Sequence, residues 1–151
     1  VLAGAVTQFW TDVVWGELDV LFIDMPPGTG DIPLTVYQSL PVDATVVVST
    51  PQSLVQMVVG KAKTMADLLN IPVVGLVENM SYLTCPDCGK KIALFGEENG
   101  LDEAARRMNI ALLAKLPIDA NVSRLCDSGE IERVVCDEIA PAVDAVEALL
   151  K

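Results

Sequence analysis

The stretch Asp19–Asp24 is the sequence feature that most constrains the fold. Its central run Val20–Ile23 is apolar throughout, with no polar alternation. Such a run is typical of a strand that is covered on both faces, as in a parallel sheet flanked by helices. A double-proline turn and the glycines Gly28 and Gly30 follow. We therefore predict a buried strand that delivers the carboxylate of Asp24 into a glycine-rich loop.

The rest of the chain alternates between helical and strand patterns. The apolar spacing predicts helices over residues 1–16, 33–40, 53–69, 97–108 and 137–151. Further buried strands are predicted over residues 44–49, 72–78 and 110–116, with an irregular loop over 80–95 and a helix or loop through residue 125. This order predicts an α/β fold with a mostly parallel sheet, right-handed crossovers and helices on both faces. Nothing resembles a linker, so residues 1–151 are expected to lie in one domain.

Composition narrows the classes of function. The hydrophobic share of 52% indicates a globular chain, and the net charge of −11 disfavours binding to nucleic acid or to an anionic membrane. No run is long enough for a membrane-spanning helix. The chain has no histidine, so a transition metal would depend on Cys, Asp or Glu. Four cysteines in a chain of this size are not a secreted disulfide framework, and we expect a cytoplasmic protein.

Asp24 and the loop after it are candidates for phosphoryl-transfer chemistry. A hydrophobic strand that ends in Asp resembles a Walker B element, which holds Mg²⁺, although Asp also caps turns. Glycines allow backbone N–H groups to approach an anion closely. Asp31 can orient an attacking water or cap the helix predicted to begin near Pro33. The candidate nucleotide-binding residues of this loop are Pro27, Gly28, Thr29 and Gly30.

The ends of the other predicted strands supply further candidates, because ligands of such sheets bind at the carboxyl ends of strands. Asn79 can read an adenine edge through its amide, or it can be a turn residue. Pro117 and Asp119 can flank a base, or cap the next helix. Gln52 is a candidate contact or a helix-start residue. We expect these residues to share one sheet edge with Asp24.

The phosphate-binding pattern G-x-x-x-x-G-K-[ST] is not found in the sequence. The pairs Gly60-Lys61 and Gly89-Lys90 lack the first glycine and the final Ser or Thr, and Gly60 falls in a predicted helix. Residues 1–151 therefore hold half of a phosphoryl-transfer site.

Cys85 and Cys88 form a C-x-x-C pair in which both thiolates can chelate one soft metal. A closed site needs four ligands. Cys126 and Cys136 are candidates to complete it, or they are small buried residues. Two copies of the chain can instead contribute two thiolates each across a dimer axis. Zinc and an iron–sulfur cluster both fit, and a thioredoxin-like redox pair is a third interpretation.

The stretches WGELDVLFIDMPPGTGD, STPQ, GLVENMSYLTCPDCGKK and LAKLPID together resemble the Mrp/ApbC-type iron–sulfur cluster carriers. These proteins belong to the MinD-like branch of deviant-Walker P-loop ATPases. The resemblance implies that Asp24 is the Walker B carboxylate and that Pro26–Asp31 is the switch region near the γ-phosphate. It also implies that Asn79 and the segment Pro117–Asp119 border the adenine.

The same resemblance implies that Cys85 and Cys88 bind a [4Fe–4S] cluster that bridges a homodimer. ATP and Mg²⁺ would drive transfer of the cluster to apo-proteins. The family's GKGGVGKS-type loop precedes the Asp24 motif and is not found here, and the sequence opens on Val1. We therefore expect the C-terminal portion of one P-loop NTPase-like domain, inactive as an ATPase by itself.

Two other functions remain as alternatives. A MinD/ParA-like positioning ATPase would often carry a basic terminal helix, whereas the C-terminal segment PAVDAVEALLK has one lysine against Asp144 and Glu147. A non-enzymatic interaction module clipped by zinc would use the cysteines and need no phosphate loop.

Overall fold

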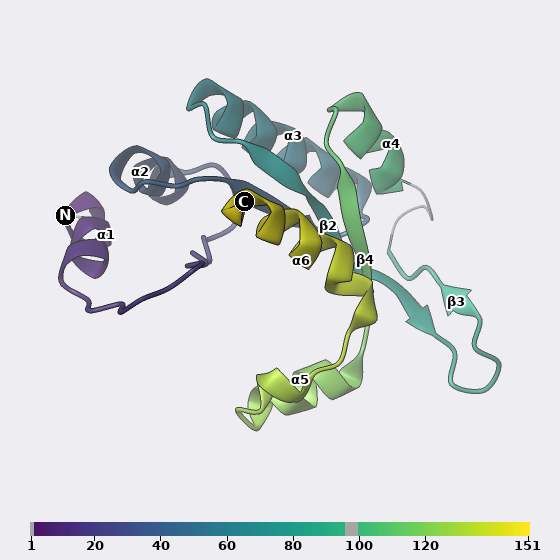
Figure 1. The fold of residues 1–151 in the computed structure, drawn as a ribbon. Helices are drawn as coiled ribbons and strands as arrows, with labels where there is room; N and C mark the ends of the chain where they lie inside the picture. Colours follow the sequence, from purple (N-terminus) through teal and green to yellow (C-terminus); the bar gives the residue numbers. More distant parts are fainter. Residues whose placement is uncertain (1, 96–99) are drawn as a thin grey trace.

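The computed structural model describes residues 2–95 and 100–151. Within these ranges, four strands form one sheet (Figure 1), namely β1 (Thr45–Ser49), β2 (Val73–Thr84), β3 (Lys91–Ile92) and β4 (Leu112–Pro117). The long strand β2 pairs in parallel with β1 and with β4, and in antiparallel with β3. The predicted α/β fold with a mostly parallel sheet is therefore confirmed.

The helices of the described ranges lie before, between and after the strands. They are α1 (Leu2–Thr11), α2 (Asp31–Ser39), α3 (Ser53–Leu68), α4 (Gly100–Arg107), α5 (Ala120–Asp127) and α6 (Ala140–Glu147). Three short 3₁₀ helices, η1 (Ile131–Arg133), η2 (Asp137–Ile139) and η3 (Ala148–Leu150), flank the last of these. Each parallel pair of strands is joined through a helix, α3 for β1 to β2 and α4 for β2 to β4, as the alternating pattern predicts.

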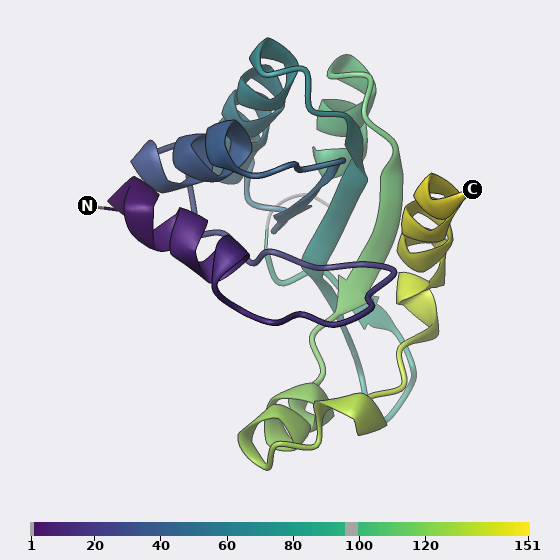
Figure 2. The same cartoon turned by 60° about the vertical axis from the view of Figure 1, so that its left-hand side comes forward.

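Both faces of the sheet are covered, because consecutive residues of β2 point to opposite sides. Leu76 packs into a core with Val59 of α3 and Leu101 of α4. Its neighbour Val77 packs on the other face with Ala114 of β4 and Ala142 of α6. Figure 2 shows α6 on one side of the sheet and α3 on the other. The expectation of helices on both faces is thus confirmed.

The predicted strand over residues 19–24 is wrong. The segment is extended but pairs with no described strand, and Phe22 is 77% exposed. An apolar run becomes a strand only where a neighbouring strand satisfies its backbone N–H and C=O groups. β1 pairs with β2, and its other edge receives no described strand. Asp24 therefore does not lie at the carboxyl end of a strand.

Several predicted boundaries also move. The first helix ends at Thr11 rather than at residue 16, where the indole Nε1–H of Trp15 donates to the carbonyl of Trp10, 3.3 Å away. That bond satisfies a carbonyl that a further helical turn would have used. The second helix begins at Asp31, before the expected start near Pro33. Residues 97–99 of the predicted fourth helix lie outside the described ranges.

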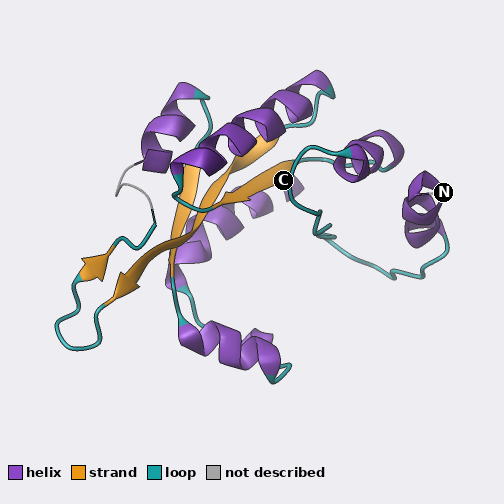
Figure 3. Cartoon of the chain, turned by 180° about the vertical axis from the view of Figure 1, so that it is seen from behind, coloured by secondary structure: helices purple, strands orange, loops and turns teal. Residues whose placement is uncertain are grey.

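The largest boundary error concerns the predicted loop over residues 80–95. β2 continues to Thr84, and β3 returns antiparallel to it, with Leu83 opposite Ile92 and Thr84 opposite Lys91. The cysteine pair therefore lies at the tip of a β-hairpin that projects from the body of the molecule (Figure 3). The apolar period of a short two-stranded arm is too brief to be told from a loop in sequence.

Candidate functional site

The parallel strands β1, β2 and β4 run in the same direction, so their carboxyl ends lie on the same side of the sheet. This side is called the carboxyl edge below. Glu78 of β2 stands opposite Ser49 of β1 on one side and Lys115 of β4 on the other. The candidates Gln52, Asn79 and Pro117 follow these three positions along the chain, so they lie at the same edge. Their nucleotide-binding roles stay predictions.

The side chains at this edge differ in how far the fold already occupies them. Gln52 is the residue before α3, and its side chain makes no hydrogen bond that caps the helix. The side chain is exposed. Asn79 Oδ1 accepts the backbone N–H of Met80, 2.9 Å away, which leaves the amide NH₂ as its donor. Asp119 is the N-cap of α5 and accepts the backbone N–H of Asn121 at 2.8 Å. The helix-cap interpretation of Asp119 therefore describes its contact in this structure.

A backbone irregularity interrupts β2 immediately after Asn79. Met80 adopts a positive φ of 56°, and the register with β4 shifts between Glu78 and Tyr82. The carboxyl group of Glu78 is 1% exposed, and the hydroxyl of Ser81 donates to its Oε1 at 2.5 Å. Among the described residues, Oε2 of Glu78 has no hydrogen-bond partner. No prediction from the sequence covered this buried side chain, although a charged residue at the end of the apolar run PVVGLVE was a visible signal.

The glycine-rich loop lies elsewhere. Gly28 has a φ of +93°, a conformation that suits glycine, and Asp31 opens α2 within its first turn. Asp31 is therefore not the N-cap, a position that Gly30 takes. Thr29 lines an open groove of about 720 Å³ formed largely by the outer side of α3, including Lys61 and Leu68. The structure therefore brings Thr29 to the side of α3, and Asp24 remains in an exposed extended segment.

No phosphate cradle is formed by the Gly-Lys pairs of the described ranges. Gly60 and Lys61 lie inside α3, where their backbone N–H groups serve the helix, and Thr64 Oγ1 donates to the Gly60 carbonyl at 2.9 Å. Gly89 lies in the turn of the cysteine hairpin with a φ of +71°. The prediction that residues 1–151 hold half of a phosphoryl-transfer site stays a prediction.

The cysteine hairpin presents two thiols on a closed turn. The N–H of Cys85 donates to the carbonyl of Lys90, and the N–H of Gly89 donates to the carbonyl of Cys85, both at 2.9 Å. Cys88 is exposed and Cys85 is partly exposed, and both are free thiols. A reagent, a metal ion or a second protein can therefore reach both sulfur atoms.

The hairpin turn also favours the thiolate form of Cys85. The backbone N–H groups of Cys88 and Asp87 point toward its sulfur and lower the pKa of the thiol below its ordinary value. Cys136 shows the opposite behaviour, because partial burial and the adjacent carboxylate of Glu138 raise its pKa. Thiolate is the form that binds metal, so the hairpin turn favours the metal-binding form of the Cys85 side chain.

The other two cysteines do not complete a site with the hairpin. Within the described part of the chain, no group of three or more Cys, Asp or Glu side chains is placed to hold a metal ion. Cys126 is exposed, so the interpretation of it as a small buried residue is wrong, and Cys136 is partly buried. The interpretation with four ligands from one chain is therefore not supported among the described residues, and the metal-binding role of Cys85 and Cys88 stays a prediction.

Comparisons with known proteins place the chain in a family. A family model described as ParA, the NUBPL iron-transfer P-loop NTPase, matches residues 1–151. The chain belongs to this family. The resemblance seen in the sequence is thereby confirmed, and so is the P-loop NTPase-like fold.

Curated relatives in the NUBPL-type family carry the name iron–sulfur cluster carrier protein. The relative from Methanocaldococcus jannaschii is 44% identical over 129 residues, which cover 85% of this chain and 44% of the relative. The relative from Haemophilus influenzae is 40% identical over 142 residues, covering 93% of this chain and 38% of the relative. The chain thus spans less than half the length of these relatives.

A solved structure of similar fold is described as the nucleotide-binding protein in complex with ADP from Archaeoglobus fulgidus. It shares 46% sequence identity with a TM-score of 0.82, and the match covers 91% of this chain and 56% of that one. Among the described residues of the present chain, no helix combines the length and the apolar character needed to cross a membrane.

Proposed function

We propose that this chain is part of an ATP-dependent iron–sulfur cluster carrier, which holds a [4Fe–4S] cluster as cargo and passes it to apo-proteins in the cytoplasm. The observation that carries the proposal is the projecting hairpin with two accessible thiols, Cys85 and Cys88. The names of relatives that are 40% to 46% identical support the same cargo.

The number of thiolate ligands that a cluster needs implies two copies of the chain. A [4Fe–4S] cluster takes four thiolates, whereas one hairpin offers two. A second copy of the hairpin supplies the other two across a two-fold axis, so the proposed carrier is a homodimer with the cluster at its interface. Zinc has a comparable preference for four thiolates and is the outcome that competes with the cluster.

The nucleotide part of the proposal rests on the strand ends and on Asp24. We assign Gln52, Asn79 and the segment Pro117–Asp119 to the base side of an ATP site. Asp24 would hold Mg²⁺ and, with Asp31, line the phosphate side. The phosphate loop would come from polypeptide outside residues 1–151, so these residues would form the C-terminal portion of one P-loop NTPase-like domain. The solved relative bound to ADP supports a nucleotide site in this fold.

Cluster reconstitution under anaerobic conditions tests the cargo. We expect the wild-type chain to bind iron and sulfide in equal amounts and to show the brown absorption of a cluster. Cys85→Ser and Cys88→Ser are each expected to abolish both, whereas Cys126→Ser, which changes an exposed thiol away from the hairpin, should retain both. A colourless protein that binds zinc without sulfide would overturn the proposal in favour of a zinc-clipped module.

Assays of ATP binding and hydrolysis test the nucleotide part of the proposal. We expect residues 1–151 alone to bind ATP weakly and not to hydrolyse it, because the phosphate contacts would be missing. A longer polypeptide that includes a phosphate loop should hydrolyse ATP, and Asp24→Asn in that polypeptide should abolish hydrolysis while leaving iron content unchanged. Full hydrolysis by the Asp24→Asn protein would remove Asp24 from the site.

A further inference from the structure

Tyr82 joins the root of the cysteine hairpin to two other parts of the fold. Its side chain is 8% exposed, and its hydroxyl donates to Oε1 of Glu138 in η2 at 3.2 Å, across a separation of 56 residues. The Nζ of Lys91, on the returning strand β3, lies 4.0 Å from the centre of its ring. One side chain therefore contacts both the second arm of the hairpin and the C-terminal segment.

The backbone of Tyr82 also contacts the end of β4. The carbonyl of Tyr82 accepts the N–H of Ile118 at 2.7 Å, and Tyr82 stands opposite Pro117 in the ladder with β4. Ile118 lies between the two nucleotide-side candidates Pro117 and Asp119. The position that holds the hairpin root thus also holds the end of β4.

The hairpin needs such support because its own ladder is short. Only two residue pairs, Leu83 with Ile92 and Thr84 with Lys91, join β2 to β3 within the described ranges. Two-stranded hairpins are marginally stable in water without packing on a third element. A cation over an aromatic face and a hydrogen bond to a carboxylate are stronger than average surface contacts.

Glu138 is a strong acceptor for the hydrogen bond from the Tyr82 hydroxyl. Its own backbone N–H and the Tyr82 hydroxyl lower the pKa of its carboxyl, so it accepts the hydrogen bond as a carboxylate at neutral pH. Lys91 contributes a favourable charge to the same group. The three side chains therefore form one charge-assisted cluster at the hairpin root.

We propose that Tyr82 is a positioning residue that fixes the direction of the Cys85–Cys88 hairpin, with Glu138 as its anchor. Tyr82 itself touches no cargo. In the carrier proposed above, on which this consequence rests, a fixed hairpin direction sets how well two hairpins meet around one cluster. Loosening the root therefore raises the rate at which a bound cluster is lost.

The first test uses Tyr82→Phe, which removes the hydroxyl and keeps the ring over which Lys91 lies. Tyr37→Phe is the matched control, because the Tyr37 hydroxyl also makes one hydrogen bond, to Thr45 Oγ1 at 3.1 Å, far from the hairpin in sequence. Amide hydrogen exchange of the metal-free chain is the readout. We expect Cys85 and Gly89 to exchange about fivefold faster in Tyr82→Phe, the loss of one hydrogen bond.

The comparison of exchange patterns separates positioning from general stability. Tyr37→Phe should leave the hairpin amides unchanged, and Glu138→Ala, which removes the acceptor of the Tyr82 hydroxyl, should accelerate the same amides as Tyr82→Phe. The double variant should be no faster than the faster single variant, because both changes break one contact. Equal exchange of Cys85 and Gly89 in wild type and Tyr82→Phe, or acceleration spread evenly over the chain, overturns the proposal.

The second test measures cluster loss to a chelator at matched iron content, in the wild type, Tyr82→Phe and Tyr37→Phe. We expect a severalfold faster loss only in Tyr82→Phe. If the wild type loads no cluster, the carrier function fails, and hydrogen exchange still decides the positioning role. If the wild type loads a cluster and Tyr82→Phe releases it at the same rate, the positioning role fails while the carrier function stands.

Discussion

The hydroxyl of Ser81 donates a 2.5 Å hydrogen bond to Oε1 of Glu78, a side chain that is 1% exposed. This bond closes the irregular turn in which Met80 takes a positive φ and Asn79 accepts its N–H. The buried carboxylate and the hydroxyl therefore hold the point where β2 leaves the body of the sheet. The part of β2 beyond this point leads into the cysteine hairpin.

Ser81→Ala should destabilise the fold by about 1–3 kcal/mol, because it deprives a buried carboxylate of a hydrogen-bond donor. Urea unfolding followed by circular dichroism measures the change. Ser128→Ala is the control, since the Ser128 hydroxyl donates to the Leu125 carbonyl from an exposed residue. Comparable stability of the two variants would show that the Ser81 bond contributes little.

Gly75→Ala should destabilise the fold by about 1–3 kcal/mol through overpacking. A Cβ at this position would lie 2.4 Å from Cγ of Leu113, which belongs to the neighbouring strand β4. It would also lie 2.8 Å from the carbonyl oxygen of Ala111, the residue before β4. Gly60→Ala is the matched change inside α3, where the one described atom within 4 Å of the new Cβ is Met108 Sδ, at 3.7 Å. It should stabilise the fold by about 0.5–1 kcal/mol. Thermal melts of both variants check the opposite signs, and two shifts of the same sign contradict the prediction.

The thiols of Cys85 and Cys136 should react with iodoacetamide over different pH ranges. The lowered pKa of Cys85 gives thiolate at a lower pH than an ordinary cysteine, whereas the raised pKa of Cys136 delays its thiolate to a higher pH. Peptide mapping of the metal-free chain across pH 6 to 10 measures both rates. We expect the midpoint for Cys85 to lie below that for Cys136, and a reversed order would contradict the hairpin geometry described above.

Phe22→Ser should reduce binding of an apolar dye with a change in stability within about 0.5 kcal/mol, because the side chain is 77% exposed. Val14 is 96% exposed, and Val14→Ser should likewise reduce dye binding with little change in stability. Val135→Ser is the control, since Val135 is 83% exposed in the C-terminal part. Unequal dye loss, larger for the two N-terminal positions, is the expected result. The reason is that the N-terminal segment also exposes Phe9 and Leu18, by 70% and 53%, and so offers the dye more apolar surface. An equal loss at all three sites would show that these N-terminal side chains do not bind the dye together.

Elements whose partners lie inside residues 1–151 follow the sequence patterns closely. The apolar run that predicts a strand over 72–78 is found in β2, because β1 and β4 pair with it on both sides. The run Val20–Ile23 has the same character and forms no strand, because no described strand pairs with it. A sequence pattern reports the preference of a segment, whereas a ladder also requires a neighbour.

The candidate site divides in a similar way. The pair Cys85 and Cys88 and the residues at strand ends carry local signals, namely a spacing and a position after an apolar run. The contact between Tyr82 and Glu138 joins residues 56 positions apart, so no local pattern predicts it. The burial of Glu78 likewise depends on distant segments, because Ser49 of β1 and Lys115 of β4 stand opposite it on either side.

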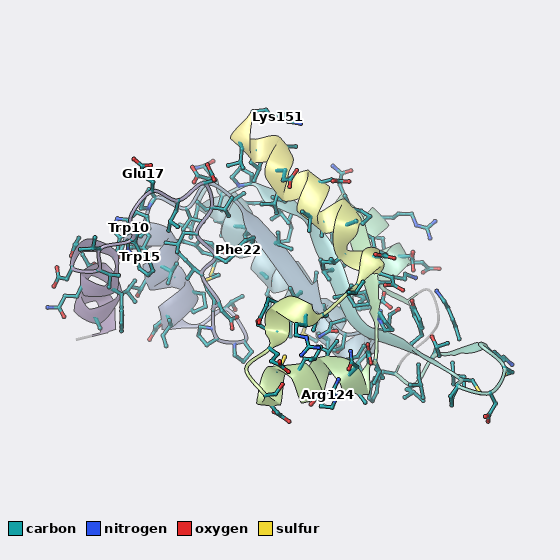
Figure 4. The ribbon with its side chains drawn as sticks, turned by 60° about the horizontal axis from the view of Figure 1, so that its bottom comes forward. Trp10, Trp15, Glu17, Phe22, Arg124 and Lys151 are labelled. Atoms are coloured by element: carbon teal, nitrogen blue, oxygen red, sulfur yellow. The ribbon has the colours of Figure 1, made fainter. Side chains whose placement is uncertain are left out.

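The indole contact at the end of α1 gives the chain a built-in optical probe. Trp10 and Trp15 are the two tryptophans of the sequence, and both belong to the N-terminal segment that also carries Phe22 (Figure 4). They are 36% and 42% exposed, so their emission should shift to the blue when another polypeptide covers this segment. No tryptophan lies in the cysteine hairpin. Intrinsic fluorescence can therefore follow association at the N-terminal end while cluster absorbance independently follows the cargo.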